Sequence, residues 1–423
     1  MDTARRLAAL LCGAAMLTGC AESSRESEGA VGEVVTSAAA TTTAVTTAAA
    51  ETTTAATTAA ASEPATEAPR VPMTELIAEG AGDFTSGIYP VVLGDADKPY
   101  VTANVFDTEQ YSDSNATGYL LADALYSCSD GGAELVTKGR LHVIGEHEGT
   151  FFYTGYHAGE YGFIRGGNAE PTDIPRSGKL DMPLCVGDSV YMRYDGYTGT
   201  DVYRIDYLGA AEKLCTLPEI NKLTDWCIEG DRIYFSSYNW ELPKSTAYKY
   251  GWYDMAAGEC KTFPNGGVGE ICGGYMYYSE DFADSRGVEH GIFRVPKNGG
   301  EPEYICDGEY FLGIFGGDVL YTVGHTYSDL SFALQSTDKL GRIYRIGHGT
   351  EGVFFDADEY YGAEKSFALT STQVLDGRLF VRLTDSDMGV HILELDTDGN
   401  VVNTVFEYEP PAEVKSTYKV LKA

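Results

Sequence analysis

The stretch from Gly187 to Cys306 repeats one pattern three times: GDSVYMRYD at 187–195, GDRIYFSSY at 230–238 and GGYMYYSED at 273–281. Each copy begins with a Gly-Asp or Gly-Gly turn and continues through an aromatic-rich strand, a polar loop, a second strand, another turn and a third strand. Short runs rich in β-branched and aromatic residues, bounded by turn residues, are typical of β-strands. We therefore expect each copy to form one blade of an antiparallel β-propeller.

The spacing of the copies supports this fold. The central aromatics Tyr191, Tyr234, Tyr277 and Tyr321 follow one another at intervals of 43, 43 and 44 residues. A period of about 40 to 50 residues is typical of four-stranded propeller blades. Weaker copies occur at 99–121, 150–164, 317–346 and 376–395. The sequence thus predicts an all-β chain with a single β-propeller of seven four-stranded antiparallel blades; six blades with an irregular first unit are the alternative.

The repeats also share a second-strand motif. Its copies are Tyr203-Arg204-Ile205, Phe293-Arg294-Val295 and Tyr344-Arg345-Ile346. Together with the Val-Tyr or Ile-Tyr-Phe of the preceding strand, these motifs resemble the bacterial propeller repeats related to the lipoprotein-receptor propeller, and TolB-type repeats. The receptor family's Tyr-Trp-Thr-Asp tetrapeptide is absent from the sequence. The resemblance implies a binding or scaffold module, although the fold alone settles no function.

The first 19 residues have the features of a targeting segment. Arg5 and Arg6 precede an apolar run from Leu7 to Leu17 that is too short to span a bilayer. The following Leu17-Thr18-Gly19-Cys20 resembles a bacterial lipobox, which implies that Cys20 becomes the acylated first residue of the mature protein. Several acyl chains give stable anchoring. We expect an extracytoplasmic protein anchored to the lipid bilayer of the bacterial cell membrane through Cys20; an ordinary secretory signal with an incidental cysteine is the alternative.

Residues 20–72 have the composition of a tether. They are nearly all Ala, Thr, Ser, Glu, Val and Gly, and they include no aromatic residue. A segment with so little to bury is expected to be disordered. A random coil of this length spans roughly 40 Å. We therefore divide the chain into a signal peptide at 1–19, a tether at 20–72 and the propeller domain at 73–423.

Charge excludes one class of partner. The chain has 30 Lys and Arg against 63 Asp and Glu, a formal net charge of -33. An acidic surface repels nucleic acid and anionic lipid. We expect a monomer with no nucleic-acid partner. The charge is also what an ordinary exported acidic protein carries on its surface.

The cysteines predict free thiols. Beyond Cys20, six of them occupy two repeated places: one before the Gly turn (Cys185, Cys227 and Cys272) and one on the last strand of the copy (Cys215, Cys260 and Cys306). In a blade, these places fall on the innermost and the outermost strand. Three strand spacings separate them by roughly 14 Å, whereas a disulfide requires Cα atoms within about 7 Å. Buried thiols are expected, with a three-thiolate metal site on the inner strands as the alternative.

Common catalytic motifs are missing. The sequence contains no GxSxG, HExxH or GxxxxGK[ST] pattern. His142 and His147, five residues apart on a predicted strand, should point to opposite faces and are expected to be surface residues. Asp396 to Asn400 begins like a calcium loop, but a hairpin turn is expected there. We expect no catalytic residue, metal or cofactor.

The loops that join the two recognisable strands of each copy are the candidate site. If these strands are the second and third of each blade, their loops all emerge on one face. The candidate ligand-binding residues in them are Tyr194, Tyr197, Tyr238, Trp240, Asp281, Phe282, Arg286, His325, Tyr327 and Asp329. Aromatic side chains with interspersed carboxylates suit a sugar or peptide surface, with Trp240, Tyr197 and Tyr327 supplying most of the contact energy. Solvated loops of a domain rich in tyrosine are the alternative.

Two functions follow from this site. The first is a tethered binding or scaffold module for a polysaccharide, peptide or protein partner. The alternative is a carbohydrate-active hydrolase or lyase that uses paired loop carboxylates, for example Asp281 with Asp329. The absence of a recognisable catalytic constellation in the sequence favours the binding module.

Overall fold

The repeated glycines form tight turns between the first two strands of a blade. Gly187, Gly230 and Gly273 have φ angles of 58°, 57° and 57°. Such left-handed backbone favours glycine, since it has no Cβ. Each turn reverses the chain between an inner strand and the aromatic-rich strand that follows it, for instance with Val186 opposite Ser189 in blade 3. The repeated turns therefore set the start of each second strand.

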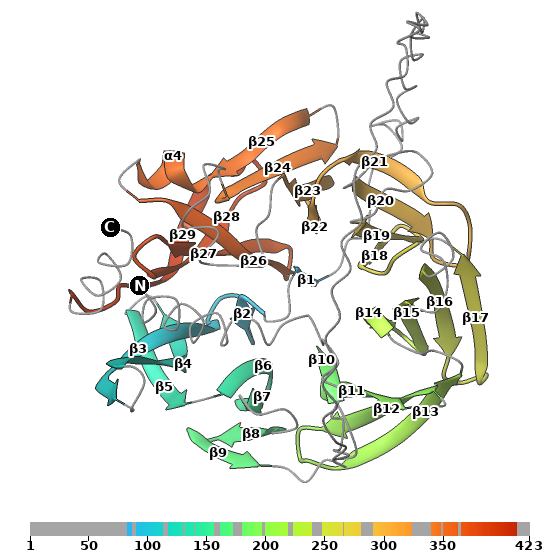
Figure 1. Ribbon diagram of the computed structural model, residues 1–423, viewed down its shortest axis with the longest axis horizontal. Helices are drawn as coiled ribbons and strands as arrows, with labels where there is room; N and C mark the ends of the chain where they lie inside the picture. Colours follow the sequence, from blue (N-terminus) through green and yellow to red (C-terminus); the bar gives the residue numbers. More distant parts are fainter. Residues whose placement is uncertain are drawn as a thin grey trace, which may run out of the picture. The chain divides into compact units, whose positions relative to one another are not determined.

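The computed structural model describes residues 83–412, with gaps at 87–89, 113–116, 130–131, 140, 156–160, 172–179, 197–198, 219–222, 239–247, 265, 281–290, 324–339, 348–349 and 363–364. Within this range the chain is nearly all β. The strands form seven four-stranded antiparallel blades, the last of them extended by a fifth strand, arranged as a seven-bladed β-propeller (Figure 1). The predicted fold and blade number are confirmed.

Within each blade the strands are neighbours in sequence order. Blade 1 consists of β2 (Val92–Leu93), β3 (Tyr100–Ser112), β4 (Thr117–Ser129) and β5 (Gly132–Gly139). Blade 2 consists of β6 (Leu141–His147), β7 (Thr150–Gly155), β8 (Tyr161–Arg165) and β9 (Asn168–Pro171). Blade 3 consists of β10 (Leu180–Val186), β11 (Ser189–Gly196), β12 (Gly199–Asp206) and β13 (Ala211–Pro218). Blade 4 consists of β14 (Leu223–Glu229), β15 (Arg232–Tyr238), β16 (Tyr248–Asp254) and β17 (Glu259–Pro264).

The remaining blades follow the same order. Blade 5 consists of β18 (Glu270–Cys272), β19 (Tyr275–Glu280), β20 (Gly291–Pro296) and β21 (Glu303–Asp307). Blade 6 consists of β22 (Tyr310–Phe315), β23 (Asp318–Thr322), β24 (Arg342–Gly347) and β25 (Thr350–Asp356). Blade 7 consists of β26 (Phe367–Leu375), β27 (Arg378–Asp385), β28 (Val390–Leu395) and β29 (Val401–Tyr408).

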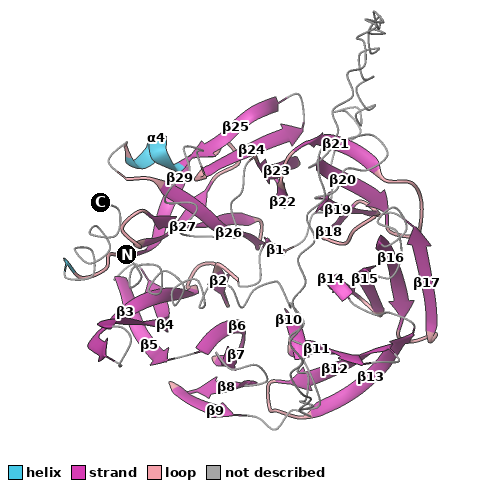
Figure 2. Ribbon diagram, viewed as in Figure 1, coloured by secondary structure: helices cyan, strands magenta, loops and turns pink. Residues whose placement is uncertain are grey.

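One short helix interrupts the strands. Helix α4 (Ala357–Tyr361) lies between blades 6 and 7 and is drawn in cyan in Figure 2. The side chain of Asp356 accepts hydrogen bonds from the backbone N–H groups of Asp358 and Glu359 and so caps the helix. In the described residues no helix is long and apolar enough to cross a membrane.

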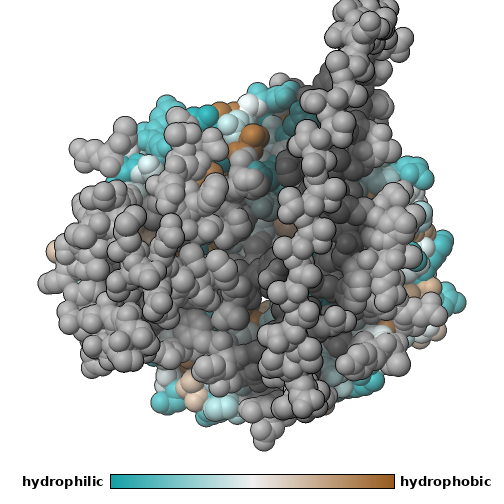
Figure 3. All heavy atoms as spheres, in the orientation of Figure 1, coloured by the Kyte–Doolittle hydropathy of each residue, from teal (hydrophilic) through white to brown (hydrophobic). Residues whose placement is uncertain are grey.

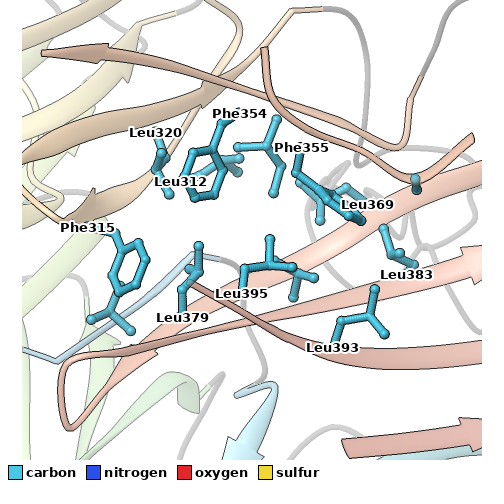
Figure 4. Close-up of a cluster of buried hydrophobic side chains, with 14 of the residues drawn as sticks. Leu312, Phe315, Leu320, Phe354, Phe355, Leu369, Leu379, Leu383, Leu393 and Leu395 are labelled. Atoms are coloured by element: carbon cyan, nitrogen blue, oxygen red, sulfur yellow. The ribbon is translucent and has the colours of Figure 1, made fainter. Parts of the chain in front are cut away.

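The core lies between neighbouring blades rather than within one of them. Figure 4 shows the cluster between blades 6 and 7, where Leu312, Phe315 and Leu320 meet Leu379 and others. Equivalent clusters join blade 5 to blade 6 and blade 7 to blade 1. Because the last blade packs on the first, the ring closes without leaving an exposed apolar sheet face at the seam.

The seam carries a short strand that the sequence did not reveal. This strand, β1 (Phe84–Ser86), pairs antiparallel with β26 as a fifth, innermost strand of the last sheet. Ser86 is tied to Thr372 by a 2.6 Å hydroxyl–hydroxyl hydrogen bond. A segment of three residues carries too little periodicity to be found in a sequence.

The strand order confirms the prediction for the cysteines. Cys185, Cys227 and Cys272 lie on innermost strands, and Cys215, Cys260 and Cys306 lie on outermost strands. All six, together with Cys128, are free thiols. Burial raises the pKa of the Cys185 thiol to about 12 and that of Cys215 to about 11. Four of the seven, Cys128, Cys215, Cys272 and Cys306, are buried and fill space in the core as small apolar groups, whereas Cys185, Cys227 and Cys260 are half-buried.

The topology gives the propeller two different faces. The recognisable strands are the second and third of each blade, as predicted. The loops that join them emerge on one side, which we call the loop face. The turns between first and second strands and between third and fourth strands emerge on the other side, which we call the turn face. Where its described residues are visible, the side drawn in Figure 3 is mainly hydrophilic, with only small hydrophobic spots.

Candidate binding site

Most of the predicted binding residues cannot be placed. Tyr197, Trp240, Asp281, Phe282, Arg286, His325, Tyr327 and Asp329 lie outside the described residues, as does Cys20, and the side chain of Tyr238 is not described. Tyr194 is described near the end of β11, where it is half-buried and packs against the cluster between blades 2 and 3. The loops themselves do begin and end on the loop face, so their predicted grouping on one side agrees with the strand order.

Directly below the loop face lies a ring of polar side chains that the sequence analysis did not identify. It consists of the fifth residue of every second strand: Asn104, Thr154, Arg193, Ser236, Ser279, Thr322 and Arg382. We call these seven residues the polar belt. Because second strands run from the turn face to the loop face, their fifth residues approach the loop face together. No blade departs from the pattern.

The layers nearer the turn face are apolar. The second residues of the same strands are Val101, Phe151, Val190, Ile233, Met276, Val319 and Leu379. None of these seven side chains is more than 4% exposed. The fourth residues are likewise all apolar or aromatic and buried, for example Met192, Phe235 and Val381. Along each strand, then, a buried apolar or aromatic fourth residue is followed by a polar fifth residue that points to the opposite face of the blade.

The inner strands lose their regular pairing at the same level. In blades 2, 3, 4 and 6, the ladder between the first and second strands shifts register before the fifth position. In blades 1 and 5 the described ladder ends before this position, and in blade 7 it shifts just beyond it. Such bulges re-aim side chains and are frequent beside functional sites. Four belt residues, Asn104, Thr154, Ser279 and Arg382, are partly exposed, whereas Arg193, Ser236 and Thr322 are buried.

Two belt residues belong to a polar chain that crosses three blades. Asn104 of blade 1 donates from Nδ2 to Oδ1 of Asp123 on the neighbouring strand. The other oxygen of Asp123 lies 2.7 Å from Nδ1 of His142 in blade 2, an ion pair when the imidazole is protonated. From blade 7, Nη2 of Arg382 donates to Oδ1 of Asn104 over 3.3 Å. We call these four residues the Arg382 cluster.

The route of the Arg382 side chain places the cluster at the inner edge of blade 1. Val101 and Ala103 pack toward blade 7, so the alternating Thr102 and Asn104 face blade 2. Arg382 nevertheless reaches both from the blade 7 side, with Nη1 at 3.5 Å from Oγ1 of Thr102. The described ladder between β2 and β3 ends at Val101. The side chain thus passes the unpaired inner edge of β3, toward the centre of the ring.

His142 also corrects an expectation. It was expected to be a surface residue, but its side chain is only 19% exposed and contacts Asp123. His147, in contrast, packs against the ring of Tyr207 in blade 3, with ring centroids 5.5 Å apart. The two imidazoles thus face different neighbouring blades, as their predicted opposite orientation requires. No described group of three His, Cys, Asp or Glu side chains is arranged to hold a metal ion.

A second polar cluster lies at the end of the same strand as Arg382. Asp385, 1% exposed, contacts Nζ of Lys365 at 2.7 Å and Nε2 of His391 at 3.0 Å. Its other oxygen accepts hydrogen bonds from the backbone N–H groups of Asp387 and Gly389, both at 2.8 Å. Although burial opposes ionisation, these partners hold the pKa of the Asp385 carboxyl well below its usual range. We call this group the Asp385 cluster.

A third buried acid has only one partner. Glu270 on β18 is 3% exposed, and its Oε2 accepts a hydrogen bond of 2.8 Å from the backbone N–H of Ile314. Its Oε1 has no hydrogen-bond partner in the part of the chain that the structure describes. Burial raises the pKa of this carboxyl to about 8, so Glu270 is mostly protonated at neutral pH. It lies close to Gly313, where an added Cβ would be 3.7 Å from Oε2.

A sequence signal for the belt does exist. Arg193, Ser236, Ser279, Thr322 and Arg382 are all the fifth residue after a two-residue turn that contains glycine. Comparing the repeats column by column would have shown that this position is polar while the preceding position is apolar or aromatic. The contacts of Arg382 with blade 1 have no such signal, because they connect positions 280 and 278 residues apart.

No family model matches this chain, and no curated protein matches its sequence. Its fold is similar to several solved structures. TolB from Acinetobacter baumannii is 10% identical, with 73% of this chain and 82% of that one covered and a TM-score of 0.32. The β-propeller domain of the Trilobed protease from Pyrococcus furiosus is 10% identical, with coverages of 71% and 82% and a TM-score of 0.34.

A longer match is to a puromycin-hydrolyzing peptidase from Mycobacterium tuberculosis. It is 10% identical, with a TM-score of 0.42, and 80% of this chain aligns with 55% of the peptidase. This chain therefore spans about half the length of that enzyme. At such identities the likeness extends to the β-propeller fold and no further.

Proposed function

We propose that this chain is an extracytoplasmic lipoprotein whose propeller binds a glycan, peptide or protein partner on the loop face. The observation that carries the proposal is the polar belt. The fifth residue of all seven second strands is polar, and it lies nearer the loop face than the buried second and fourth residues. Four of these residues, Asn104, Thr154, Ser279 and Arg382, are partly exposed and can offer polar groups to a ligand, with loops beyond them that vary in sequence from blade to blade.

The path of β1 supports this choice of face. Asp83 accepts a hydrogen bond of 2.9 Å through Oδ1 from the backbone N–H of Asp376, which lies in a turn on the turn face. Strand β1 then runs antiparallel to β26, from the turn face toward the loop face. The described part of the propeller therefore begins at Asp83 on the turn face, opposite the loops of the proposed site.

Lipid anchoring is tested by replacing the acylated residue. In the full-length protein expressed in a bacterial host, Cys20→Ala should abolish labelling by a radioactive fatty acid and move the protein from the membrane fraction to the soluble fraction. Cys12→Ala, in the apolar part of the signal, is the matched control and should leave both unchanged. Continued labelling of the Cys20→Ala protein would show that the lipobox assignment is wrong.

Binding is tested with the full-length protein on a panel of glycans and cell-wall peptides. We expect retention of at least one class of ligand with no product formed. Release of shortened sugars that stops in the Asp281→Asn and Asp329→Asn variants would favour the hydrolase or lyase instead. Asp398→Ala, an exposed residue in a turn on the turn face, serves as the control and should bind normally.

A further inference from the structure

Arg382 carries a charge that the fold does not neutralise directly. Its guanidinium makes two hydrogen bonds, of 3.5 Å and 3.3 Å, and both acceptors are uncharged oxygens. In the described residues no carboxylate lies within 4.0 Å of it as an ion-pair partner. Burial lowers the pKa of the guanidinium, which means that its surroundings disfavour the charged form. A buried or half-buried arginine normally has a carboxylate or several strong acceptors.

The nearest acid is directed toward other groups. Asp123 acts on Arg382 electrostatically, but its Oδ1 accepts from Asn104, and its Oδ2 lies 2.7 Å from Nδ1 of His142 without a hydrogen bond to a described group. Asn104 donates to Asp123 and accepts from Arg382. The polar chain therefore leaves its excess donors at one end, on the guanidinium.

The donors that remain are suited to a planar anion. A guanidinium has five N–H donors in a rigid fork, and the two long bonds to Thr102 and Asn104 use only a part of them. Arg382 is half-buried, so part of it stays accessible to solvent. Carboxylates bind such a fork through two parallel hydrogen bonds. We propose that Arg382, positioned by Thr102 and Asn104 at the inner edge of blade 1, binds the carboxylate group of the ligand.

Charge favours a carboxylate over a dianion such as phosphate. The net charge of the chain is -33, and Asp123 lies in the same cluster. Each added negative charge on the ligand is opposed by this field, whereas a single charge is compensated by one arginine. Two sources supply a carboxylate to the extracytoplasmic space: an acidic sugar and the free C-terminus of a peptide. Both would meet the fork in the same way.

This inference rests on the proposed function, since it specifies the ligand of the same binding site. The probes are therefore two matched pairs: glucuronic acid with glucose, and N-acetylglycylalanine with its C-terminal amide. Binding to the full-length protein is measured by calorimetry and by the Nε–Hε resonances of arginine labelled with nitrogen-15. We expect the acid of at least one pair to bind about tenfold more tightly than its neutral partner and to shift one arginine resonance.

Variants assign the site. Arg382→Gln should weaken binding of the acid by about tenfold or more and remove the shifted resonance. Arg382→Lys, which keeps the charge but not the fork, should lose affinity to a smaller extent. Arg204→Gln is the control, because Arg204 is an exposed arginine on a third strand that already pairs with Glu212 at 2.8 Å. A thermal melt of each variant establishes that it is folded.

The outcomes are distinct. Preference for glucuronic acid identifies an acidic sugar, preference for the peptide acid identifies a C-terminus, and preference for both identifies carboxylates in general. If neither acid exceeds its neutral partner, or if Arg382→Gln retains full affinity, the inference is wrong. A neutral glycan or peptide that binds equally to wild type and Arg382→Gln would overturn this inference while leaving the proposed binding function intact.

Discussion

Strand β27 contributes to two polar clusters that lie three residues apart and differ in how completely they are bonded. Asp385 has four partners between 2.7 and 3.0 Å, two of them backbone N–H groups. Arg382 has two, at 3.3 and 3.5 Å. Asp385 lies at the end of the strand, against the segment around Lys365 that follows helix α4, whereas Arg382 projects across the inner edge of blade 1.

The directions of the pKa shifts describe the same difference. The surroundings of Asp385 lower its pKa and so favour its charged form, while those of Arg382 lower its pKa and so disfavour its charged form. Glu270 is intermediate, with one hydrogen bond and a raised pKa. A fully bonded charge stabilises the fold, whereas an incompletely bonded one costs stability and is retained where it has another use.

The largest effect is expected at Asp385. Replacing it with Asn removes the charge that pairs with Lys365 and His391, so the free energy of unfolding at pH 7 should fall by about 3 kcal/mol or more. Because the pKa of Asp385 is lowered in the folded state, its contribution is present above about pH 4 and is lost as the pH falls further. Urea denaturation at pH 7 and pH 3.5 measures both effects.

The matched control for this prediction is Asp398→Asn, an exposed aspartate in the turn between β28 and β29. It should change the free energy of unfolding by no more than about 0.5 kcal/mol. Equal stability of the two variants would show that the Asp385 cluster does not hold the blade.

The second prediction concerns Glu270, the buried carboxyl with a single hydrogen bond. The pKa of Glu270 is about 8 in the folded protein, against an ordinary value of 4.5. The carboxyl thus stays protonated to a higher pH in the folded state than in the unfolded state. Its contribution to the free energy of unfolding is therefore fully present below about pH 4.5 and is lost as the pH rises to about 8. Each unit of pKa difference corresponds to about 1.4 kcal/mol.

The Glu270→Gln variant tests this, because the amide keeps an acceptor for the N–H of Ile314 without titrating. Denaturation midpoints from pH 4.5 to pH 8 should fall more steeply for the wild type than for the variant. Glu301→Gln, at an exposed position, should retain the wild-type slope. Parallel slopes for all three proteins would mean that Glu270 titrates normally.

The third prediction extends the comparison to the loops above the belt. Trp240→Ala and Tyr327→Ala should each weaken a bound ligand, since an aromatic anchor typically contributes about 2 kcal/mol, roughly thirtyfold in affinity. The melting temperature should hardly change, because these loops lie outside the strands. Normal binding by both variants, with loss of binding on substitution at the turn face, would reverse the assignment of the two faces.

The smallest effect is expected for the reactivity of the cysteine thiols, which should depend neither on the two charged clusters nor on a bound ligand. Burial raises the pKa of the Cys227 thiol to about 12 and that of Cys128 to about 11, so native protein should react slowly with a thiol reagent at neutral pH. Denatured protein prepared without reductant should react at all seven free cysteines of the described domain. Mass spectrometry that finds Cys185 linked to Cys215 would contradict the strand order.

The sequence predicted what repeats. The blades, the order of their strands, the two faces and the cysteine positions all follow from a pattern copied along the chain, because equivalent positions of a repeat meet equivalent surroundings. The polar belt has the same origin and was recoverable from aligned copies, as the arginines of GDSVYMR and DGRLFVR illustrate.

Features that are present in one blade alone could not be predicted from the sequence. Strand β1 has three residues, and its partner β26 lies at the other end of the chain. The contacts of Arg382 depend on how far β2 extends, which local sequence does not determine. Asp385 appeared as one more acidic residue of a hairpin, since its partners Lys365 and His391 come from different segments. Long-range polar contacts of this kind leave no periodic trace.

The most direct test of the account is the stability of the Arg382→Gln protein in urea, measured beside the wild type and Asp385→Asn. If Arg382 is kept for a ligand, removing its charge relieves an unfavourable burial, and the variant should be as stable as the wild type within about 0.5 kcal/mol, or more stable. A loss as large as that of Asp385→Asn would show that the Arg382 cluster supports the fold, and would contradict the distinction drawn between the two clusters.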